Sequence, residues 1–432
     1  MKRKLTFCMM LVLLCSLFAG CSRKQANGKV YYLNADTELD AAWQSLSKKY
    51  TEKTGVEVEV LTPAKGQYDE TLTAEMEKSD APTLFRVNGP AELAKRKNEC
   101  IDLSDTAVYK ELKNESFALQ EDGKVYGIPY AVESYGILYN KELLERYFAS
   151  DFATVKKVED INNFDSFSKV VREIQAHKDE LGIDGAFAST GMSTGRQYKH
   201  YLANLPLYYE YADKKISMAD KIEGTYLDGY KQIWDLYINN ATVEPAALSD
   251  KTEADAQTEF KTGKAVFYQS GTWDYSGLKE EDGVGLKDEQ LGMLPIYIGV
   301  AGEEQQGLCT GSENYWCVSS KASEADKQAT LDFLHWLVTD ETGTEALAED
   351  MGFVIPYKQA KSGNNPLVTI AEEYMTNGKT PVGWSFTTVP SEDWISGVGT
   401  ALGNYATGKG NWDAVQKAFT DNWETEYKKA NG

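Results

Sequence analysis

The sequence predicts an α/β protein built as two lobes, with the chain crossing between the lobes more than once. After residue 28 about 400 residues remain, which is more than a single hydrophobic core usually serves. A strand, a helix and a second strand open this part of the chain, and strands and helices alternate again near its end. Helix-rich stretches lie between these two parts, so we expect the chain to pass from one lobe to the other and back.

The opening segment has the clearest periodicity. Residues 29–33 are typical of a strand, and residues 56–61 alternate apolar and acidic side chains as a half-buried strand does. Residues 36–54 between them predict a helix that ends at Gly55. A strand–helix–strand unit of this kind implies a right-handed crossover and a parallel strand pair. One face of the predicted helix carries Leu39, Trp43, Leu46 and Tyr50.

Further elements follow in order along the chain. Asp122-Gly123 predicts a hairpin turn before a strand at residues 125–129. Amphipathic helices are expected where apolar side chains recur at helical spacing. The remaining predicted helices cover residues 70–78, 91–97, 166–178, 227–239, 324–338 and 412–428, and the remaining strands cover residues 83–87 and 265–268.

The N-terminus predicts export. Basic residues 2–4 precede an apolar run over residues 5–18, which is too short to span a bilayer and remain there. Residues 17–21 resemble the lipobox of bacterial lipoproteins, in which a cysteine is lipidated and becomes the first residue. We therefore expect residues 1–20 to be a lipoprotein signal peptide, Cys21 to be lipidated, and residues 21–28 to tether the protein to the extracellular face of the cell membrane. The alternative is an ordinary signal peptide with Cys21 as an incidental thiol.

The chain is strongly acidic. Its formal net charge is −21, or −24 without the three cations of the signal peptide. A negative field of this size disfavours nucleic acid and anionic lipid as partners, and we expect a monomer. Histidines are rare and lie far apart, without a Cys or His at ligand spacing, so we expect no metal site and no cofactor. They are His177, His200 and His335.

Three thiols remain if Cys21 is lipidated, so at least one of them is unpaired. They belong to Cys100, Cys309 and Cys317. Cys309 and Cys317 can form a disulfide if residues 310–316 make a tight loop. The sequence alone does not decide whether this disulfide forms.

Two features invite a catalytic interpretation that the sequence does not support. Residues 403–410 nearly fit a phosphate-binding P-loop, but they lack the Ser or Thr that holds magnesium and follow a helix-like segment. A helix end followed by a turn is therefore favoured. Carboxylates are frequent in so acidic a chain, and nothing singles out two of them as the catalytic acid and nucleophile of a glycosidase. We expect no enzyme.

Residues 127–143 read GIPYAVESYGILYNKEL, a P-x-A-V-E strand followed by I-L-Y-N-K-x-L. This segment closely resembles the first crossing between lobes in extracellular solute-binding protein family 1, the sugar-binding lipoproteins of ABC importers related to maltose-binding protein. Residues 265–273, AVFYQSGTW, resemble the family's strand and turn that end in a tryptophan. The resemblance covers nearly all of the mature chain. Further family segments match residues 294–295, 311–320, 339–343 and 352–356.

The resemblance implies the type II periplasmic-binding-protein fold, or Venus-flytrap fold, with hinge crossings between its lobes. Residues 29–133 and 298–345 would form the N-terminal lobe. Residues 134–297 and 346–432 would form the C-terminal lobe. The ligand would bind in the cleft between these lobes.

The expected site joins aromatic platforms to planar polar groups, because a sugar presents flat C–H faces and edges rich in hydroxyls. The resemblance implies that Glu133 binds sugar hydroxyls, that Trp273 stacks on a sugar ring, and that Trp394 lies near a second stacking position. Core packing is the alternative for each tryptophan, and a surface carboxylate is the alternative for Glu133. The residues expected to bind the ligand are Tyr68, Asn88, Glu133, Gln269, Trp273, Glu313, Trp384 and Trp394.

The sequence therefore predicts the lipid-anchored solute-binding subunit of an ABC importer. It would bind a carbohydrate, an oligosaccharide, and deliver it to permease subunits in the membrane, with the ATPase on a separate chain. A non-sugar solute such as a polyamine or a peptide is the alternative ligand. A surface glycoside hydrolase, which would show turnover, and a structural surface lipoprotein, which would bind no solute, are alternatives of other classes.

Overall fold

A computed structural model describes residues 28–189, 197–351, 353–361 and 363–431. The predicted signal peptide, Cys21, nearly all of the tether and Gly352 of the last family segment lie outside these ranges. The chain divides into two compact units. The first unit has two segments, the residues up to Phe85 and Val318–Trp336. The second unit comprises Arg86–Cys317 and Leu337–Gly432. The lobe limits given by the sequence stay a prediction.

The first unit opens with the predicted strand–helix–strand. Strand β1 (Val30–Leu33) pairs in parallel with β2 (Val58–Leu61) and with β3 (Leu84–Val87), so the predicted parallel pair is confirmed. Helix α2 (Asp40–Thr54) connects β1 to β2. It ends at Gly55, which adopts the left-handed conformation with φ 77° that an L side chain disfavours.

Helix α2 buries its apolar face as the periodicity predicts. Trp43, Leu46 and Tyr50 are buried, and the Trp43 ring packs edge-on against Tyr32 of β1 at 5.0 Å between centroids. Leu39 is half-buried and precedes the helix in a short 3-10 turn.

The first sheet has the strand order β2-β1-β3-β11-β5-β4. Strands β4 (Leu119–Glu121) and β5 (Lys124–Pro129) form an antiparallel hairpin, and β11 (Tyr315–Val318) pairs antiparallel with β5. Asp122 and Gly123 both have positive φ, at 52° and 73°, which is the backbone of a type I′ turn. The predicted hairpin turn is confirmed.

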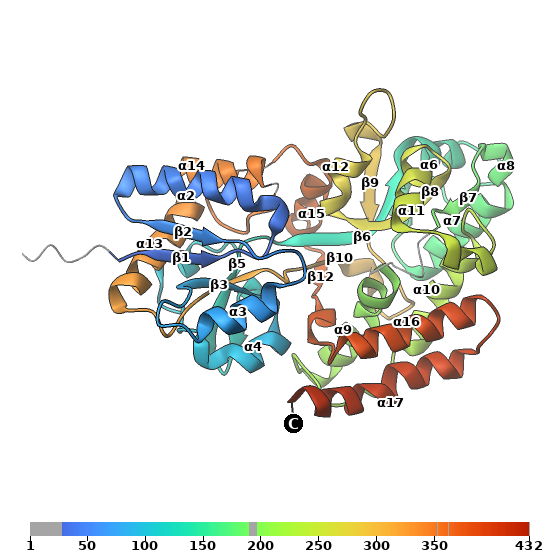
Figure 1. Ribbon diagram of the computed structural model, residues 1–432. Coiled ribbons are helices and arrows are strands. Elements are labelled where there is room, and N and C mark those ends of the chain that lie inside the picture. The colour runs from blue at the N-terminus through green and yellow to red at the C-terminus, as the bar shows by residue number, and fades with distance from the viewer. Residues whose placement is uncertain (1–27, 190–196, 352, 362, 432) are drawn as a thin grey trace, which may run out of the picture. The chain divides into compact units, whose positions relative to one another are not determined.

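The second sheet is built around β6 (Glu133–Asn140), the long central strand in Figure 1. Its strand order is β12-β10-β6-β8-β7, and β9 also pairs with β6. The partner strands are β7 (Gly185–Phe187), β8 (Ala265–Gly271), β9 (Leu291–Leu294), β10 (Gln306–Gly311) and β12 (Thr380–Val382).

Helices pack on both sheets, and several match their predicted limits closely. The helix predicted at residues 227–239 has those limits in the structure. The α-helices after α2 are α3 (Tyr68–Met76), α4 (Pro90–Arg96), α5 (Ala107–Lys110), α6 (Lys141–Phe148), α7 (Phe164–Ala176), α8 (Lys178–Leu181), α9 (Asn204–Lys214), α10 (Leu227–Asn239), α11 (Glu253–Lys261), α12 (Tyr275–Leu278), α13 (Glu324–Thr339), α14 (Glu341–Glu345), α15 (Pro366–Thr376), α16 (Glu392–Ala406) and α17 (Trp412–Asn431).

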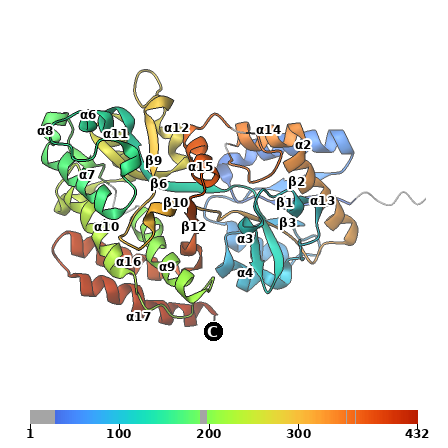
Figure 2. The ribbon, with the colours of Figure 1, turned by 180° about the vertical axis from the view of Figure 1, so that it is seen from behind.

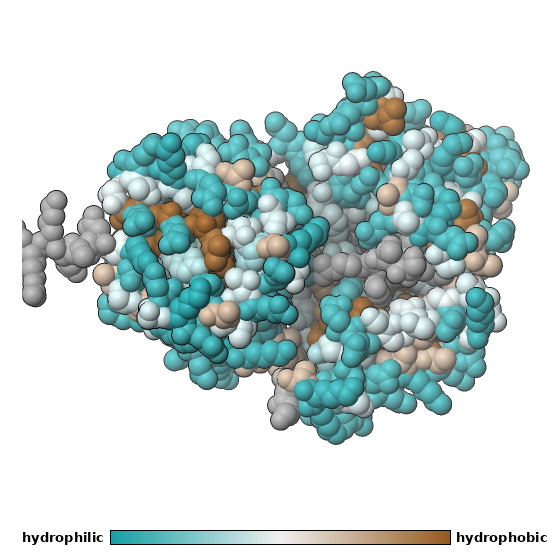
Figure 3. Space-filling model, viewed as in Figure 1, coloured by the Kyte–Doolittle hydropathy of each residue, from teal (hydrophilic) through white to brown (hydrophobic). Residues whose placement is uncertain are grey.

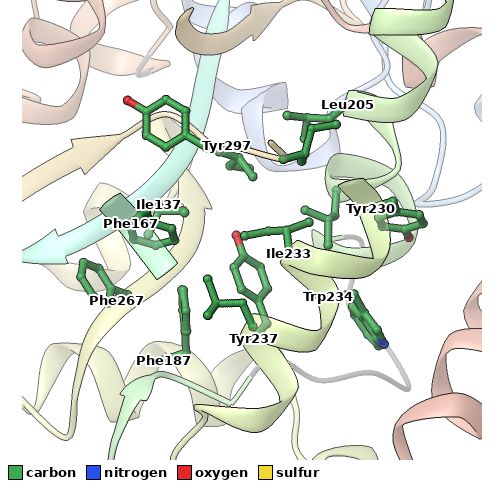
Figure 4. Close-up of a cluster of buried hydrophobic side chains, with 14 of the residues drawn as sticks. Ile137, Phe167, Phe187, Leu205, Tyr230, Ile233, Trp234, Tyr237, Phe267 and Tyr297 are labelled. Atoms are coloured by element: carbon green, nitrogen blue, oxygen red, sulfur yellow. The ribbon is translucent and has the colours of Figure 1, made fainter. Parts of the chain in front are cut away.

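The largest core lies in the second unit, between its sheet and the helices α7 and α10. Phe167 of α7 packs edge-on against Phe267 of β8 at 5.3 Å, and Phe187 of β7 lies 4.4 Å from Tyr237 of α10. Figure 4 shows these rings together with Ile137 of β6. Burial of large apolar side chains at this point fixes the second sheet that carries the candidate site.

Helices α16 and α17 lie side by side in the same unit, as Figures 1 and 2 show from opposite sides. Helix α16 ends at Ala406, and Gly408 after it has φ 70°. The P-loop-like sequence at residues 403–410 is therefore a helix end followed by a turn, as predicted.

Hydrophilic residues cover most of the face seen in Figure 3, in keeping with the charge of −21. Within the described ranges, no helix has both the length and the apolar character needed to cross a membrane.

The cysteines lie in different sheets. Cys309 is on β10 of the second sheet and Cys317 is on β11 of the first, and both are buried free thiols. The disulfide between them that the sequence left open is absent from the described structure, because the chain changes sheets between Gly311 and Tyr315 instead of closing a tight loop.

A buried carboxylate anchors one loop of the second unit. Glu210 of α9 is 3% exposed and accepts hydrogen bonds from the backbone N–H groups of Glu223, Gly224 and Thr225 at 2.6, 2.8 and 3.2 Å. The Lys214 ammonium lies 2.9 Å away. Burial would raise the pKa of the Glu210 carboxyl, but these donors outweigh it and lower the pKa below its ordinary value.

Glu210→Gln should reduce the free energy of unfolding at pH 7 by about 1.5–3 kcal/mol, because the amide loses the charge and one acceptor. Since the folded-state pKa is lowered, the stabilisation is fully present above the unfolded-state pKa of about 4.3 and is lost as pH falls through the lowered value. Urea unfolding at several pH values measures the difference between the two proteins. Glu223→Gln is the matched control, because Glu223 also pairs with Lys214 but is 66% exposed. A Glu210→Gln protein as stable as the wild type at pH 7 would contradict this role.

Candidate functional site

The candidate site lies where β6 begins. In an antiparallel sheet, directly opposed residues project their side chains to the same face, and so do residues two apart on one strand. Glu133 pairs with Gly311 of β10, and Tyr135 pairs with Gly271 of β8. Glu133 and Tyr135 therefore share one face of the sheet with two glycines that place no side chain on it.

Two indole rings occupy the space that these glycines leave. A β-carbon on Gly271 would lie 2.3 Å from Cζ3 of Trp273, and a β-carbon on Gly311 would lie 2.5 Å from Cγ of Trp384. Neither distance is compatible with an L side chain, so each ring rests directly on strand backbone. The absence of a side chain at both glycines is what allows the two rings to lie on this face.

Tyr135 lies between the two tryptophans. Its ring centroid is 6.1 Å from that of Trp273 and 5.9 Å from that of Trp384. The Tyr135 hydroxyl donates to the backbone oxygen of Tyr201 at 2.9 Å, and the Tyr201 ring packs on Trp273 at 5.2 Å. Burial, together with the neighbouring Cys309, raises the pKa of Tyr135 far above its ordinary value, so the hydroxyl stays a neutral donor.

The residues on either side of Trp273 are held by hydrogen bonds. Thr272 accepts a bond at its backbone oxygen from Asn365 Nδ2 at 2.8 Å. The Asp274 carboxylate accepts from Ser270 Oγ at 2.9 Å and from Gln257 Nε2 at 2.5 Å. Both neighbours of Trp273 are thus anchored without a ligand, which limits the backbone ordering that binding would require.

Glu133 and Trp273 line one cavity of about 640 Å³. This volume falls in the range of small-molecule sites. Both side chains are partly exposed there. The sequence predicted these two residues as parts of one site, and the structure brings them together.

The charged groups of this cavity are mostly acidic. Four carboxylates and two ammonium groups line it. Lys361 lies 3.2 Å from Glu341 and also contacts Glu345, and Lys113 lies 3.8 Å from Glu372. The lining carboxylates are Glu133, Glu349, Asp350 and Glu372, and the lining lysines are Lys113 and Lys361.

A second cavity of about 470 Å³ also includes Trp273 in its lining. Tyr201, Gln257 and Asp274 contribute to it as well. Trp273 is thus shared by two cavities, and the same groups that anchor its turn supply polar atoms to the second one.

The other predicted site residues have varied positions. Trp384 is half-buried and lines neither cavity, and its Nε1 has no hydrogen-bond partner among the described residues. Asn88 is half-buried beside Gly89, whose α-carbon faces Thr387 of the turn that follows Trp384. Glu313 is half-buried two residues after Gly311. Tyr68 is 7% exposed at the start of α3, in the first unit.

Trp394 and Gln269 are the most deeply buried of the predicted residues. Trp394 is 0% exposed, its Nε1 donates to the Phe419 backbone oxygen at 2.9 Å, and its ring packs edge-on against Trp423 at 5.0 Å. It holds α16 to α17, so the expected stacking role is corrected to core packing. Gln269 is 1% exposed on β8 and lines neither of the two cavities, so its expected ligand contact stays a prediction.

Sequence reasoning missed the parts of the site that support the tryptophans. Tyr135 lies inside the P-x-A-V-E segment, and Gly271 and Gly311 lie inside matched family segments, so their positions were visible but their function was not. Tyr201 gave no signal. Within the part of the chain that the structure describes, no group of three or more His, Cys, Asp or Glu side chains is arranged to hold a metal ion.

Comparison with known proteins identifies the family to which the chain belongs. A family model described as bacterial extracellular solute-binding protein matches residues 45–376, well over half of the chain. No curated protein sequence matches the chain.

Solved structures share the fold. A family 1 extracellular solute-binding protein from Bifidobacterium longum subsp. infantis superposes with a TM-score of 0.69 at 18% identity, over 92% of this chain and 100% of that one. The apo form of RafE from Streptococcus pneumoniae superposes with a TM-score of 0.66 at 16% identity, over 95% of this chain and 100% of that one. The GacH receptor of Streptomyces glaucescens GLA.O superposes with a TM-score of 0.62 at 18% identity, over 94% of this chain and 99% of that one. The predicted two-lobe α/β class is confirmed.

Proposed function

The chain belongs to the bacterial extracellular solute-binding proteins, and from this premise we propose that it binds a carbohydrate, an oligosaccharide, and delivers it to the permease of an ABC importer. The observation that carries the proposal is the cavity shared by the Glu133 carboxylate and the Trp273 indole. A carboxylate accepts hydrogen bonds from two hydroxyls, and an indole face packs on the C–H face of a sugar ring. The chain performs no covalent chemistry in this proposal.

Relatives with the same fold support a sugar as the ligand class. RafE has been solved in complex with raffinose, and GacH in complex with acarbose. Both ligands are oligosaccharides. The two cavities that meet at Trp273 fit a ligand of more than one ring, since one indole can border two neighbouring sugar units.

Transport would depend on closure. In a two-lobe binding protein, the ligand stabilises the closed form only as far as it contacts both lobes. We assign Glu133, Trp273 and Trp384 to the ligand, with Tyr68, Asn88 and Glu313 as further contacts supplied by the predicted N-terminal lobe. Calorimetry against a set of mono- and oligosaccharides that includes raffinose tests the proposal directly.

A cationic solute is the second candidate, because carboxylates outnumber lysines in the lining of the larger cavity and both lysines there have acidic partners. Thermal-shift measurements with a panel of solutes distinguish a carbohydrate ligand from a cationic one. A sugar-binding protein is stabilised by neutral oligosaccharides in the presence of 0.15 M salt and is indifferent to spermidine, whereas a polyamine-binding protein gives the opposite result.

The family is extracellular, and we propose a lipid anchor at Cys21 that holds a monomer on the outer face of the cell membrane. The support is the lipobox-like sequence of residues 17–21, with polar residues directly after the cysteine. Two lipid signals, a thioether-linked diacylglycerol and an amide-linked acyl chain, provide stable anchoring.

Cys21→Ala should release the protein into the medium or leave it unprocessed, because the proposed anchor has no second hydrophobic element. Fractionation of cells and mass spectrometry of the N-terminus measure this outcome. Ser22→Ala is the control and should leave processing unchanged. A Cys21→Ala protein that is cleaved after residue 20 and still membrane-bound would contradict the anchor.

Trp273→Ala should weaken oligosaccharide binding about tenfold or more, since stacking contacts contribute about 1–3 kcal/mol and 1.4 kcal/mol is tenfold. Its melting temperature should change little, because the ring is partly exposed on the sheet surface. Trp394→Ala is the matched control and should lose about 3–5 kcal/mol of stability as a core truncation. Calorimetry and thermal unfolding of both variants give the two readouts. A Trp273→Ala protein that binds as tightly as the wild type would remove this residue from the site.

Glu133→Gln should weaken binding without abolishing it, because the amide keeps the shape and one acceptor but turns the other oxygen into a donor. Glu133→Ala should weaken binding further, as charge-assisted hydrogen bonds contribute about 1.5–3 kcal/mol. Calorimetry with the oligosaccharide identified above measures both variants, and chromatography of the bound sugar monitors turnover. If the wild type cleaves its sugar and Glu133→Gln abolishes the cleavage, the protein is a glycoside hydrolase.

A further inference from the structure

Asn365 precedes helix α15, and its side chain caps that helix. The Leu367 N–H donates to Asn365 Oδ1 at 3.0 Å, which satisfies one of the backbone donors that a helix leaves open at its start. Pro366 occupies the first helical position and has no N–H of its own to satisfy. The cap therefore occupies the oxygen of the Asn365 amide.

The nitrogen of the same amide reaches the turn that carries Trp273. Asn365 Nδ2 donates to the Thr272 backbone oxygen at 2.8 Å. A backbone N–H can only donate and a backbone carbonyl can only accept, so the two partners allow one orientation of the amide. An aspartate would keep the cap but could not donate to the Thr272 carbonyl. The two bonds together therefore require an amide at this position.

Helix α15 gives this amide a firm base. Leu367 is fully buried and belongs to the same apolar cluster as Leu138 of β6 and Met293 of β9. Towards the other end of the helix, the Tyr374 hydroxyl donates to the Met293 backbone oxygen at 3.2 Å. The helix is thus fixed to the second sheet near both of its ends, and the amide of Asn365 extends from this fixed element.

Thr272 is held from a second side, close to Glu133. The Ser134 N–H donates to Thr272 Oγ1 at 3.4 Å, and Ser134 directly follows Glu133 at the start of β6. Thr272 itself is buried. The bonds from Ser134 and Asn365 together hold the residue that precedes Trp273.

Asn365 also lies where two walls of the larger cavity meet. The stretch from Ala348 to Asn365 supplies more than half of the described residues that line this cavity, and Asn365 is the last of them. Thr272 and Trp273 line the same cavity from the end of β8. The hydrogen bond between Asn365 and Thr272 therefore joins these two walls.

We propose that Asn365 is a positioning residue for ligand binding, which holds the turn of Trp273 in place through the Thr272 carbonyl. The inference rests on the proposed function, because Trp273 is the sugar platform assigned there. Without the donor at Asn365, the Thr272 carbonyl loses a partner and binding must order the turn, which lowers affinity. Asn365 acts through the indole and not on the sugar.

Fluorine NMR of the free protein, labelled with 5-fluorotryptophan, tests the position of the ring without any sugar. Trp273→Ala identifies the Trp273 signal among those of the nine tryptophans. Asn365→Asp should shift or broaden this signal, because the carboxylate keeps the cap but repels the Thr272 carbonyl. An unchanged Trp273 signal in this variant overturns the proposal.

Asn163→Asp is the matched control. Asn163 caps α7 by accepting from the Ser166 N–H at 2.9 Å, and it lines neither cavity at Trp273. This variant should leave the Trp273 signal and the affinity for oligosaccharide unchanged. Both aspartate variants should lose no more than about a few degrees in melting temperature. A drop for Asn365→Asp far beyond that of the control marks a general structural role and overturns the proposal.

Calorimetry with the oligosaccharide that the wild type binds is the second arm. Asn365→Asp should weaken binding about threefold to tenfold, and less than Trp273→Ala does, because the ring is still present. In the Trp273→Ala background, Asn365→Asp should change the affinity by less than about twofold, since its effect passes through the missing ring. Effects that multiply in the double variant show that Asn365 acts independently of Trp273, and they overturn the proposal.

The two arms separate this inference from the proposed function. If Trp273→Ala weakens binding and Asn365→Asp does not, the proposed function stands and the role of Asn365 is wrong. A wild type that binds no oligosaccharide overturns the proposed function, and the fluorine signal then still tests whether Asn365 positions the ring.

Discussion

The arrangement of the candidate site depends on one steric constraint: two positions on strands flanking β6 must carry no side chain. Because opposed residues of an antiparallel pair share a face, a β-carbon at Gly271 or Gly311 would stand where an indole ring lies. The two rings then flank Tyr135, whose hydroxyl is fixed by the Tyr201 backbone. Glu133 lies on the same face, beside Gly311. The pairing register of one strand thus sets the positions of the aromatic rings and of the carboxylate together.

Local signals in the sequence were sufficient for much of the fold. The Asp122-Gly123 turn requires two residues with positive φ, and few residue pairs tolerate this. Helix α10 matches its predicted limits because the apolar periodicity starts and stops sharply. Gly55 marks the end of α2 for the same kind of local reason. Turns and helix ends that depend on the backbone preference of one or two residues can therefore be predicted from the sequence.

Contacts distant in sequence could not be predicted in this way. Trp273 and Trp394 are both aromatic residues near family motifs, and only the packing of α17 on α16 separates the core residue from the partly exposed one. Gln269 points to the same face as Gly271, but two residues deeper in the sheet, where neither cavity reaches it. Cys309 and Cys317 are close in sequence, yet the chain passes from one sheet to the other between them. Closeness in sequence is therefore no guide to whether these two thiols can pair.

Charge narrows the ligand class further than shape does. The larger cavity has four carboxylates and two lysines in its lining, and the lysines lie near Glu341, Glu345 and Glu372, so no ammonium group is left without a carboxylate close by. An anionic solute such as a sugar acid or a sugar phosphate would meet uncompensated negative potential from these groups and from a chain with net charge −21. A neutral sugar meets no such penalty, because hydroxyl donors satisfy carboxylate acceptors without adding charge. The charged groups that line the cavity thus disfavour acidic solutes at the cavity itself.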